Sequence, residues 1–273
     1  MSTLNAVYDL ASSPPTFDFL GFLLSAERER LRLGRDSVDV YIADGPANGF
    51  REDNLAPREP SERRRMLDNI VKPLCSLLPS CARVVHGEPV LGVDFPVGYS
   101  QHNHLSHYGT DKLVQAWRDD CFPLTSGKVK KENYVTVTLR GAAYWPTRNS
   151  NARAWPHLVR TLRNKVADVR VIGDADLSNA FYRAQYYERA RLNLFVNSGP
   201  HAMAASMRNA NCLVFKMCAP SAVCCDADFF KRQGLPVGSQ IGRENHRIVW
   251  EDDTEEILVS ETLKELERYG LYH

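Results

Sequence analysis

The sequence predicts an α/β protein built of two halves, each with a mainly parallel sheet. Short apolar or β-branched runs alternate along the chain with amphipathic segments, as in β-α-β units with right-handed crossovers. A polar and basic stretch, PLTSGKVKK at residues 123–131, separates two series of this alternation. The length of 273 residues also suits two domains of ordinary size. We therefore expect a first domain at 1–126, a second at 127–255 and a C-terminal helix at 256–273.

The first half begins with an apolar run and continues with a long helix that Gly34 is expected to end. The next strand alternates in polarity and is β-branched at Val38, Val40 and Ile42. A second helix opens at Pro60, and its apolar side chains recur at helical spacing. The expected elements are strands at 6–10, 37–43, 82–85 and near 95–99, and helices at 17–33, 60–78 and 111–119.

The second half opens with a strong strand, YVTVTL, and later contains a continuous apolar run at residues 192–196. Such a run is typical of a strand that is buried on both faces. Thr254 precedes two glutamates, a pattern that favours an N-cap with acidic residues in the first helical turn. The expected elements are strands at 134–139, 169–173, 192–196, 212–217 and 246–250, and helices at 152–165, 180–191, from 199 onward, 226–233 and 254–269.

Composition and charge narrow the class of protein. A net charge of +1 argues against nucleic-acid binding that relies on overall charge. No apolar run approaches the roughly 20 residues that span a bilayer, and the N-terminus lacks the pattern of a signal peptide. A cytoplasmic location without a transmembrane segment is therefore the expectation. The seven cysteines are scattered and odd in number, which predicts reduced thiols rather than a disulfide framework.

The turn after residues 192–196 has the pattern of an anion site. Ser198 is placed to cap a helix, and Gly199 lets a ligand approach the backbone. A helix that begins just beyond the carboxyl end of a strand presents free N–H groups to a phosphate or diphosphate. His201, in the first turn, is a candidate donor to a phosphate oxygen, and Asn197 belongs to the same turn. The alternative is an ordinary strand–turn–helix connection with no ligand.

Two arginines follow the first strand of the second half. Arg140 stands at its carboxyl end, where open α/β sheets bind ligands, and Arg148 lies in the loop beyond. Because arginine binds phosphate in a bidentate manner, the pair and the turn at Ser198 together predict a diphosphate site. The alternative is that Arg148 and Arg153 are solvated loop charges and that Trp145 belongs to the core.

These motifs resemble the donor half of GT-B glycosyltransferases, and most of all the heptosyltransferase-like group. The resemblance covers residues 134–217 and lies in Arg140, in WPTRNSNARAW, in VRVIGDA and in FVNSGPHAMAASMRNANCLVF. In that group an acidic residue stands where this chain has Asn197. The resemblance implies two Rossmann-like halves that face each other across a cleft. The second half would bind a nucleotide sugar and the first an acceptor, with the C-terminal helix packing back on the first domain.

The resemblance also implies a reaction. A glycosyltransferase of this kind moves a sugar from a nucleotide-sugar donor to a hydroxyl of a saccharide or other acceptor, inverting the anomeric centre without a metal or other cofactor. A base must then deprotonate the acceptor. Asp18 and Asp44 are the candidates, with Asp94 a weaker third, although each also suits a cap or a turn. The alternatives are a nucleotide-sugar epimerase or hydrolase of the same fold, or a non-catalytic binding subunit. The oligomeric state stays open.

Two further clusters have simpler interpretations. His102, His104 and His107, with His86 and two cysteines in the same half, suggest zinc, but no paired Cys-x-x-Cys accompanies them. A polar loop rich in histidine is the interpretation that we prefer, so no metal is expected. Residues 63–65 are three consecutive arginines beside glutamates, which indicates a solvated helix face rather than a contact with lipid or nucleic acid.

Overall fold

The computed structural model describes residues 2–52, 59–87, 92, 94, 124, 129–166, 168–173, 179–219, 222 and 225–271. In these residues the chain is an α/β protein with a three-stranded and a five-stranded sheet, both parallel. The predicted fold class is confirmed to this extent. The chain divides into two compact units, unit 1 being Met1–Ser126 with Ser178–Phe181, and unit 2 being Gly127–Leu177 with Tyr182–His273. The strand expected near 95–99 and the helix expected at 111–119 lie outside the described residues.

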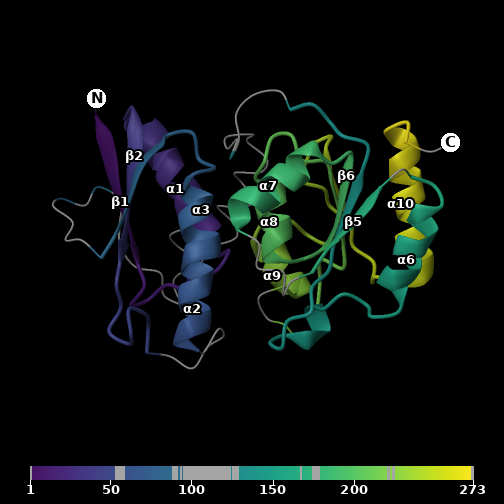
Figure 1. Ribbon diagram of the computed structural model, residues 1–273, viewed down its shortest axis with the longest axis horizontal. Helices are drawn as coiled ribbons and strands as arrows, with labels where there is room; N and C mark the ends of the chain where they lie inside the picture. The colour runs from purple at the N-terminus through teal and green to yellow at the C-terminus, as the bar shows by residue number, and fades with distance from the viewer. Residues whose placement is uncertain are drawn as a thin grey trace. The chain divides into compact units, whose positions relative to one another are not determined.

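Unit 1 is a β-α-β-α-β unit whose strands lie in the order β1-β2-β3. Its helices lie on the same side of β1 and β2 (Figure 1), as two right-handed crossovers in one direction require. Val38, Val40 and Ile42 alternate inward from β2 and are buried, as their spacing predicts. The elements are β1 (Thr3–Asp9), α1 (Phe19–Arg32), β2 (Ser37–Ala43), α2 (Pro60–Met66), the π-helical turn η1 (Leu67–Val71), α3 (Lys72–Cys75) and β3 (Cys81–His86).

Helix α1 ends where its sequence predicts. Gly34 follows the helix in the left-handed region, with φ +62°. The backbone N–H of Arg35 then reaches back to the carbonyl of Arg30 at 2.9 Å, and that of Gly34 to Leu31 at 3.2 Å. These bonds satisfy carbonyls that the helix end leaves without partners.

Unit 2 has its strands in the order β5-β4-β6-β7-β8 and carries helices on both faces of the sheet. In Figure 1, α7 and α8 lie on one side of β5 and β6, and α6 and α10 lie on the other. The elements are β4 (Val135–Thr138), the 3-10 turn η2 (Pro146–Arg148), α6 (Ala154–Arg163), β5 (Val169–Ile172), α7 (Ala180–Arg189), β6 (Leu192–Val196), α8 (Gly199–Ala205), β7 (Cys212–Phe215), α9 (Ala227–Arg232), β8 (His246–Val249) and α10 (Glu255–Arg268).

Helix α10 packs within unit 2. Its buried side chains Leu258 and Leu266 belong to the same hydrophobic core as Trp155 of α6 and Phe215 of β7. The rings of Trp155 and Phe215 meet edge to face, with centroids 5.9 Å apart. The resemblance implies that this helix packs back on the first domain; in the structure its apolar face is covered by the core of unit 2.

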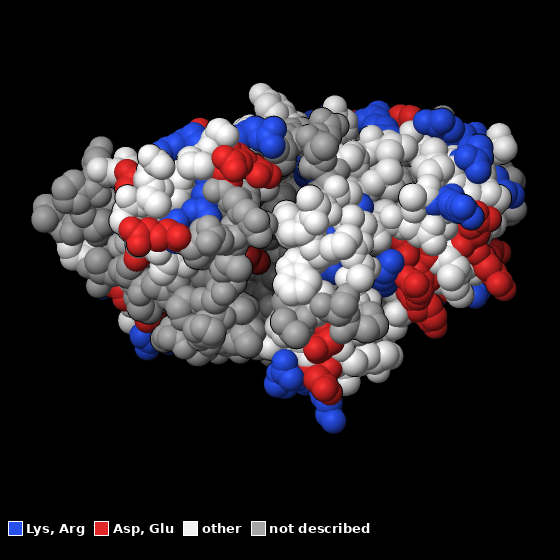
Figure 2. Space-filling model, turned by 90° about the horizontal axis from the view of Figure 1, so that it is seen from below, with Lys and Arg blue, Asp and Glu red and all other residues white. Residues whose placement is uncertain are grey.

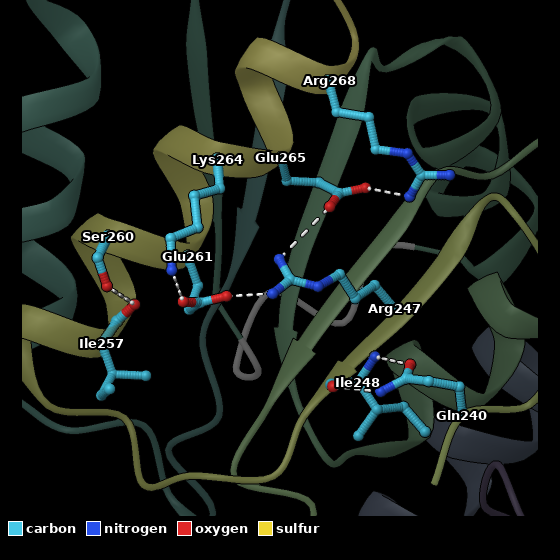
Figure 3. A network of polar contacts seen from close by, with 9 residues as sticks. All are labelled: Gln240, Arg247, Ile248, Ile257, Ser260, Glu261, Lys264, Glu265 and Arg268. Atoms are coloured by element: carbon cyan, nitrogen blue, oxygen red, sulfur yellow. Dashed lines mark hydrogen bonds and ion pairs between the residues drawn. The ribbon is translucent and has the colours of Figure 1, made fainter. Parts of the chain in front are cut away.

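Charged side chains join α10 to the edge strand β8 (Figure 3). Arg247 of β8 forms ion pairs with Glu261 and, at 3.5 Å, with Glu265, which also pairs with Arg268 at 3.0 Å. Gln240 closes the outer edge of the strand, because its amide accepts from the N–H of Ile248 and donates to the carbonyl of the same residue, both at 2.8 Å. An edge strand covered in this way is protected from pairing with another chain.

The charged residues are mixed in sign on the face that Figure 2 shows. Basic and acidic side chains both occur there, in groups separated by uncharged surface. This distribution agrees with the net charge of +1. In the part of the chain that the structure describes, no helix is both long and apolar enough to cross a bilayer.

Candidate functional site

The strand order of unit 2 contains a topological switch point between β4 and β6. From β4 the chain passes to β5 on one side and then returns to β6 on the other, so β4 and β6 are neighbours. The helices that follow these two strands, α6 and α8, lie on opposite faces of the sheet (Figure 1). The loops after β4 and β6 therefore diverge at the carboxyl edge. In open α/β sheets this is where ligands bind.

Arg140 organises the loop that follows β4. It is only 6% exposed, and its guanidinium donates to the carbonyls of Tyr144 at 3.0 Å and Trp145 at 3.1 Å and to the side chain of Asn149. Its own backbone exchanges hydrogen bonds with Ser150. Arg140 thus lies at the predicted strand end, and these contacts give it a structural role in shaping the loop.

The loop places two aromatic rings at the surface. Tyr144 is 40% exposed and Trp145 is 41% exposed, so the alternative that Trp145 is a core residue is wrong. Trp145 also has φ +53°, in the left-handed region that a bulky side chain seldom occupies. Backbone strain of this kind gathers at ligand sites, where the surrounding structure holds it in place.

Arg148 connects the loops after β4 and β6. Its Nη2 donates to the backbone carbonyl of Asn197 at 3.3 Å. The amide of Asn197 in turn donates to the carbonyl of Met217, beyond β7, at 2.9 Å. The structure therefore brings together two of the predicted residues, Arg148 and Asn197, and ties them to the end of a third strand.

The turn at Ser198 forms as predicted. Ser198 is the N-cap of α8, and its hydroxyl accepts from the backbone N–H of His201 at 3.4 Å. Gly199 is the first residue of the helix. Helix α8 has only seven residues, so its dipole is weaker than that of a long helix. Side chains, more than the helix end, must supply the charge at this edge.

The side chain of His201 does not lie where it could contact a ligand. The sequence predicts an imidazole that reaches a phosphate, but the ring is 1% exposed and its Nε2 lies 2.8 Å from Nε2 of His246. Burial lowers the pKa of His201 to about 3 and is also the main cause that lowers the pKa of His246 well below its usual value. Both rings are therefore neutral groups of the core.

Lys216 and Asp253 are site residues that the sequence analysis misses. Asp253 is 1% exposed and accepts from Trp155 Nε1 and from the N–H of Asn151, both at 2.7 Å, and from Lys216 Nζ at 3.0 Å. Burial by itself lowers the pKa of Lys216, but the hydrogen bond and charge of Asp253, with that of Asp252, outweigh it and raise the pKa. The available signal is that Lys216 comes directly after the apolar run Cys212–Phe215, much as Arg140 comes after the expected strand at 134–139.

In unit 1 the carboxyl edge holds Asp44 and His86. Asp44 follows β2, His86 ends β3, and Nε2 of the imidazole lies 3.0 Å from Oδ1 of the carboxylate. Two glycines leave room for this pair. A Cβ on Gly49 would lie 3.0 Å from Oδ1, and one on Gly87 would lie 3.3 Å from Oδ2. Both glycines also have positive φ, so side chains there would be strained.

The other candidates of unit 1 have structural contacts. Asp18 is exposed at the start of α1 and accepts from the Thr16 hydroxyl at 3.0 Å, without capping the helix. Asp94 pairs with Asn5 at the edge of β1 through its backbone and its carboxylate. Residues 63–65 are expected to form a solvated helix face, but Arg63 is buried. It is 4% exposed and donates to the carbonyl of Arg51 at 2.6 Å.

The histidines at 102, 104 and 107 lie outside the described residues. Within the described ranges, no three His, Cys, Asp or Glu side chains are grouped so that they could hold a metal ion. Comparison of the chain with protein-family models, curated proteins and solved structures found no match. The likeness to heptosyltransferase-like enzymes stays a prediction from short motifs.

Proposed function

We propose that this chain is a glycosyltransferase that moves a sugar from a nucleotide-sugar donor to an acceptor hydroxyl, with inversion and without a metal. The observation that carries the proposal is the switch point of unit 2. There Arg148, the capped turn at Ser198 and Lys216 lie on loops that contact one another. The proposal includes the GT-B arrangement expected from the sequence, with two Rossmann-like halves on either side of a cleft.

In this proposal the loops of unit 2 bind the donor. Cleavage of the sugar–phosphate bond leaves a nucleoside diphosphate, whose growing negative charge must be stabilised by fixed positive groups. Arg148 supplies a guanidinium for bidentate contacts, and the turn from Asn197 to Gly199 lets the diphosphate approach the backbone. Tyr144 and Trp145 offer exposed rings against which a nucleobase stacks. Arg140 holds the loop that carries these groups.

The carboxyl edge of unit 1 supplies the base. A carboxylate that accepts from one imidazole nitrogen fixes the ring and leaves its other nitrogen able to take a proton. With Asp44 accepting from Nε2–H, Nδ1 of His86 removes the proton of the acceptor hydroxyl as the hydroxyl attacks the sugar. Asp18, which is held by Thr16, is the weaker of the two carboxylates predicted from the sequence.

One observation favours a second candidate, a non-catalytic nucleotide-binding subunit. Arg140 and Lys216 both make contacts with protein atoms, Arg140 with loop carbonyls and Lys216 with two carboxylates. If the remaining charge at the edge binds a donor without cleaving it, the chain is a binding protein.

Incubating the full chain with nucleotide sugars and a mixture of saccharide acceptors, with and without EDTA, distinguishes the transferase from the binding subunit. Transfer that EDTA does not reduce supports the transferase, and binding without turnover supports the alternative. Free sugar or an epimer without acceptor indicates a hydrolase or epimerase.

Loss of either member of the unit 1 pair is expected to abolish transfer while leaving the donor bound. Asp44→Asn and His86→Gln should each lower kcat by about 100-fold or more, because a positioned base contributes roughly 10²–10⁴-fold. Asp39→Asn, near the start of the strand β2 that Asp44 follows, is the matched control and should stay within a few-fold of wild type. Equal activity in all three variants would exclude the pair as the base.

A further inference from the structure

Two cysteines of unit 1 lie at the ends of a single tight turn. Cys75 is the last residue of α3 and Cys81 the first of β3, with five residues between them. The carbonyl of Cys75 accepts from Leu78 N–H at 3.1 Å, and the carbonyl of Leu78 accepts from Cys81 N–H at 3.0 Å. These two hydrogen bonds fold the chain between the cysteines, and the thiol of Cys75 lies close enough to Cys81 to lower the pKa of Cys81.

The two thiols differ in access and in acidity. Cys75 is fully buried, and its thiol also donates to the carbonyl of Val71 at 3.5 Å. Cys81 is partly exposed, with its sulfur 3.6 Å from the carbonyl of Arg83. The contact with Cys75 is the largest influence on the pKa of Cys81 and lowers it, whereas burial raises the pKa of Cys75 well above its usual value. Cys81 is thus the thiol that meets solvent and ionises first.

The cysteines of unit 2 offer a contrast. Burial raises the pKa of Cys212 to about 12 and also raises the pKa of Cys218. A raised pKa suppresses the thiolate, which is the species that reacts with an oxidant. The conditions for selective oxidation are therefore met at Cys81 and not at these two positions.

We propose that Cys75 and Cys81 form a redox-sensitive pair that closes to a disulfide when the protein meets hydrogen peroxide. The Cys81 thiolate attacks one peroxide oxygen, the O–O bond breaks, and the departing hydroxide takes a proton and leaves as water. Cys81 is then a sulfenic acid. The sulfur of Cys75 attacks the Cys81 sulfur, the S–O bond breaks, and the hydroxide leaves as water with the Cys75 proton. Two thiols are oxidised and one peroxide is reduced to two waters.

The disulfide joins α3 covalently to the strand whose last residue is His86. Closing it fixes the start of β3 against the helix, and the oxidised protein is expected to have a higher melting temperature, which dithiothreitol reverses. The pair is independent of the proposed glycosyl transfer, since neither cysteine belongs to the sites described above.

The test uses one tryptic peptide of the full chain. Cleavage after Arg65 and Arg83 releases residues 66–83, which contain both cysteines, because Lys72 precedes proline and is not cleaved. The native protein is treated with a small molar excess of hydrogen peroxide, blocked with N-ethylmaleimide and digested without reductant. We expect the peptide to lose the mass of two hydrogens and to carry no maleimide, and we expect dithiothreitol to restore both thiols. A peptide that carries two maleimides, or a Cys81 sulfinic acid without a disulfide, would overturn the proposal.

Two variants test the order of the steps. In Cys75→Ser the resolving thiol is absent, so the Cys81 sulfenic acid should accumulate and be trapped by dimedone. Cys218→Ser is the control, and the disulfide should form in it as in wild type. If Cys75→Ser does not fold, the peptide from the wild-type protein still decides the question.

Discussion

Lowering the pH from 7 to 5 is expected to destabilise unit 2 by about 2 kcal/mol through His201, and His246 adds to the loss in the same direction. Both imidazoles are buried, and they face each other at 2.8 Å between Nε2 atoms. One ring donates and the other accepts, and burial keeps both rings neutral. A proton added to either ring would place an uncompensated charge in the core.

The direction follows from the pKa values. Burial lowers the pKa of His201 from 6.5 to about 3, and lowers that of His246 well below 6.5. Between these values the unfolded chain binds protons that the folded chain does not. The stability that the neutral rings contribute is therefore complete above pH 6.5 and declines as the pH falls below 6.5. For His201 the decline is about 1.4 kcal/mol per pH unit down to about pH 3, and His246 contributes in the same direction. Carboxylates add little above pH 5, because their unfolded pKa values lie near 4.

Urea unfolding at pH 7, 6 and 5, followed by tryptophan fluorescence, measures this slope. His201→Gln keeps an amide beside His246 but removes one titrating group, so the slope should fall by about 1.4 kcal/mol per pH unit. His157, which is 44% exposed in its side chain, provides the control His157→Gln with an unchanged slope. A wild-type stability that does not change between pH 7 and 5 would contradict the neutral pair.

Asp253→Ala is expected to cost about 3–5 kcal/mol of stability at neutral pH. The carboxylate is 1% exposed and accepts from Trp155 Nε1, from the backbone of Asn151 and from Lys216. Removing it leaves the buried indole N–H of Trp155 without its acceptor and leaves the partly buried ammonium of Lys216 with Asp252 alone. The same change loosens the loop after β4, because Asn151 starts the connection to α6. Breaking such a pair on one side costs far more than the pair contributes.

The neighbouring residue supplies the control for this prediction. Asp252 also pairs with Lys216, at 3.2 Å, but its side chain is 70% exposed. Asp252→Asn should therefore change the free energy of unfolding by less than about 1 kcal/mol, as exposed ion pairs do. Chemical unfolding of both variants measures the two free-energy costs. Equal costs in the two variants would mean that burial of Asp253 does not carry the effect.

Local signals predict most of the secondary structure. The apolar run at Leu192–Val196 and the alternating run at Ser37–Ala43 form strands with the expected bounds. Thr254 caps α10 through the N–H of Ile257 at 3.3 Å, as its place before two glutamates predicts. The partner of α10 is not predictable, because an amphipathic face does not specify which apolar surface will cover it.

The candidate sites are predictable only where one segment forms them. Ser198 and the strand-end position of Arg140 follow from their neighbours in sequence. The contacts of His201 with His246 and of Asp44 with His86 join positions 45 and 42 residues apart, so no local pattern reveals them. The orientation of His201 is decided in the same way, since the helix start fixes its backbone while the core of unit 2 determines where the ring lies.

The most direct test of the central claim is isothermal titration of the full chain with uridine, guanosine and adenosine diphosphates. We expect one of them to bind without added metal, and Arg148→Ala to weaken that affinity by about 10-fold, or 1.4 kcal/mol. Arg153→Ala removes the same charge from an exposed neighbouring position and should change the affinity by less than about 2-fold. Absence of binding by any diphosphate, or equal weakening by the two variants, would contradict a phosphate site at the switch point of unit 2.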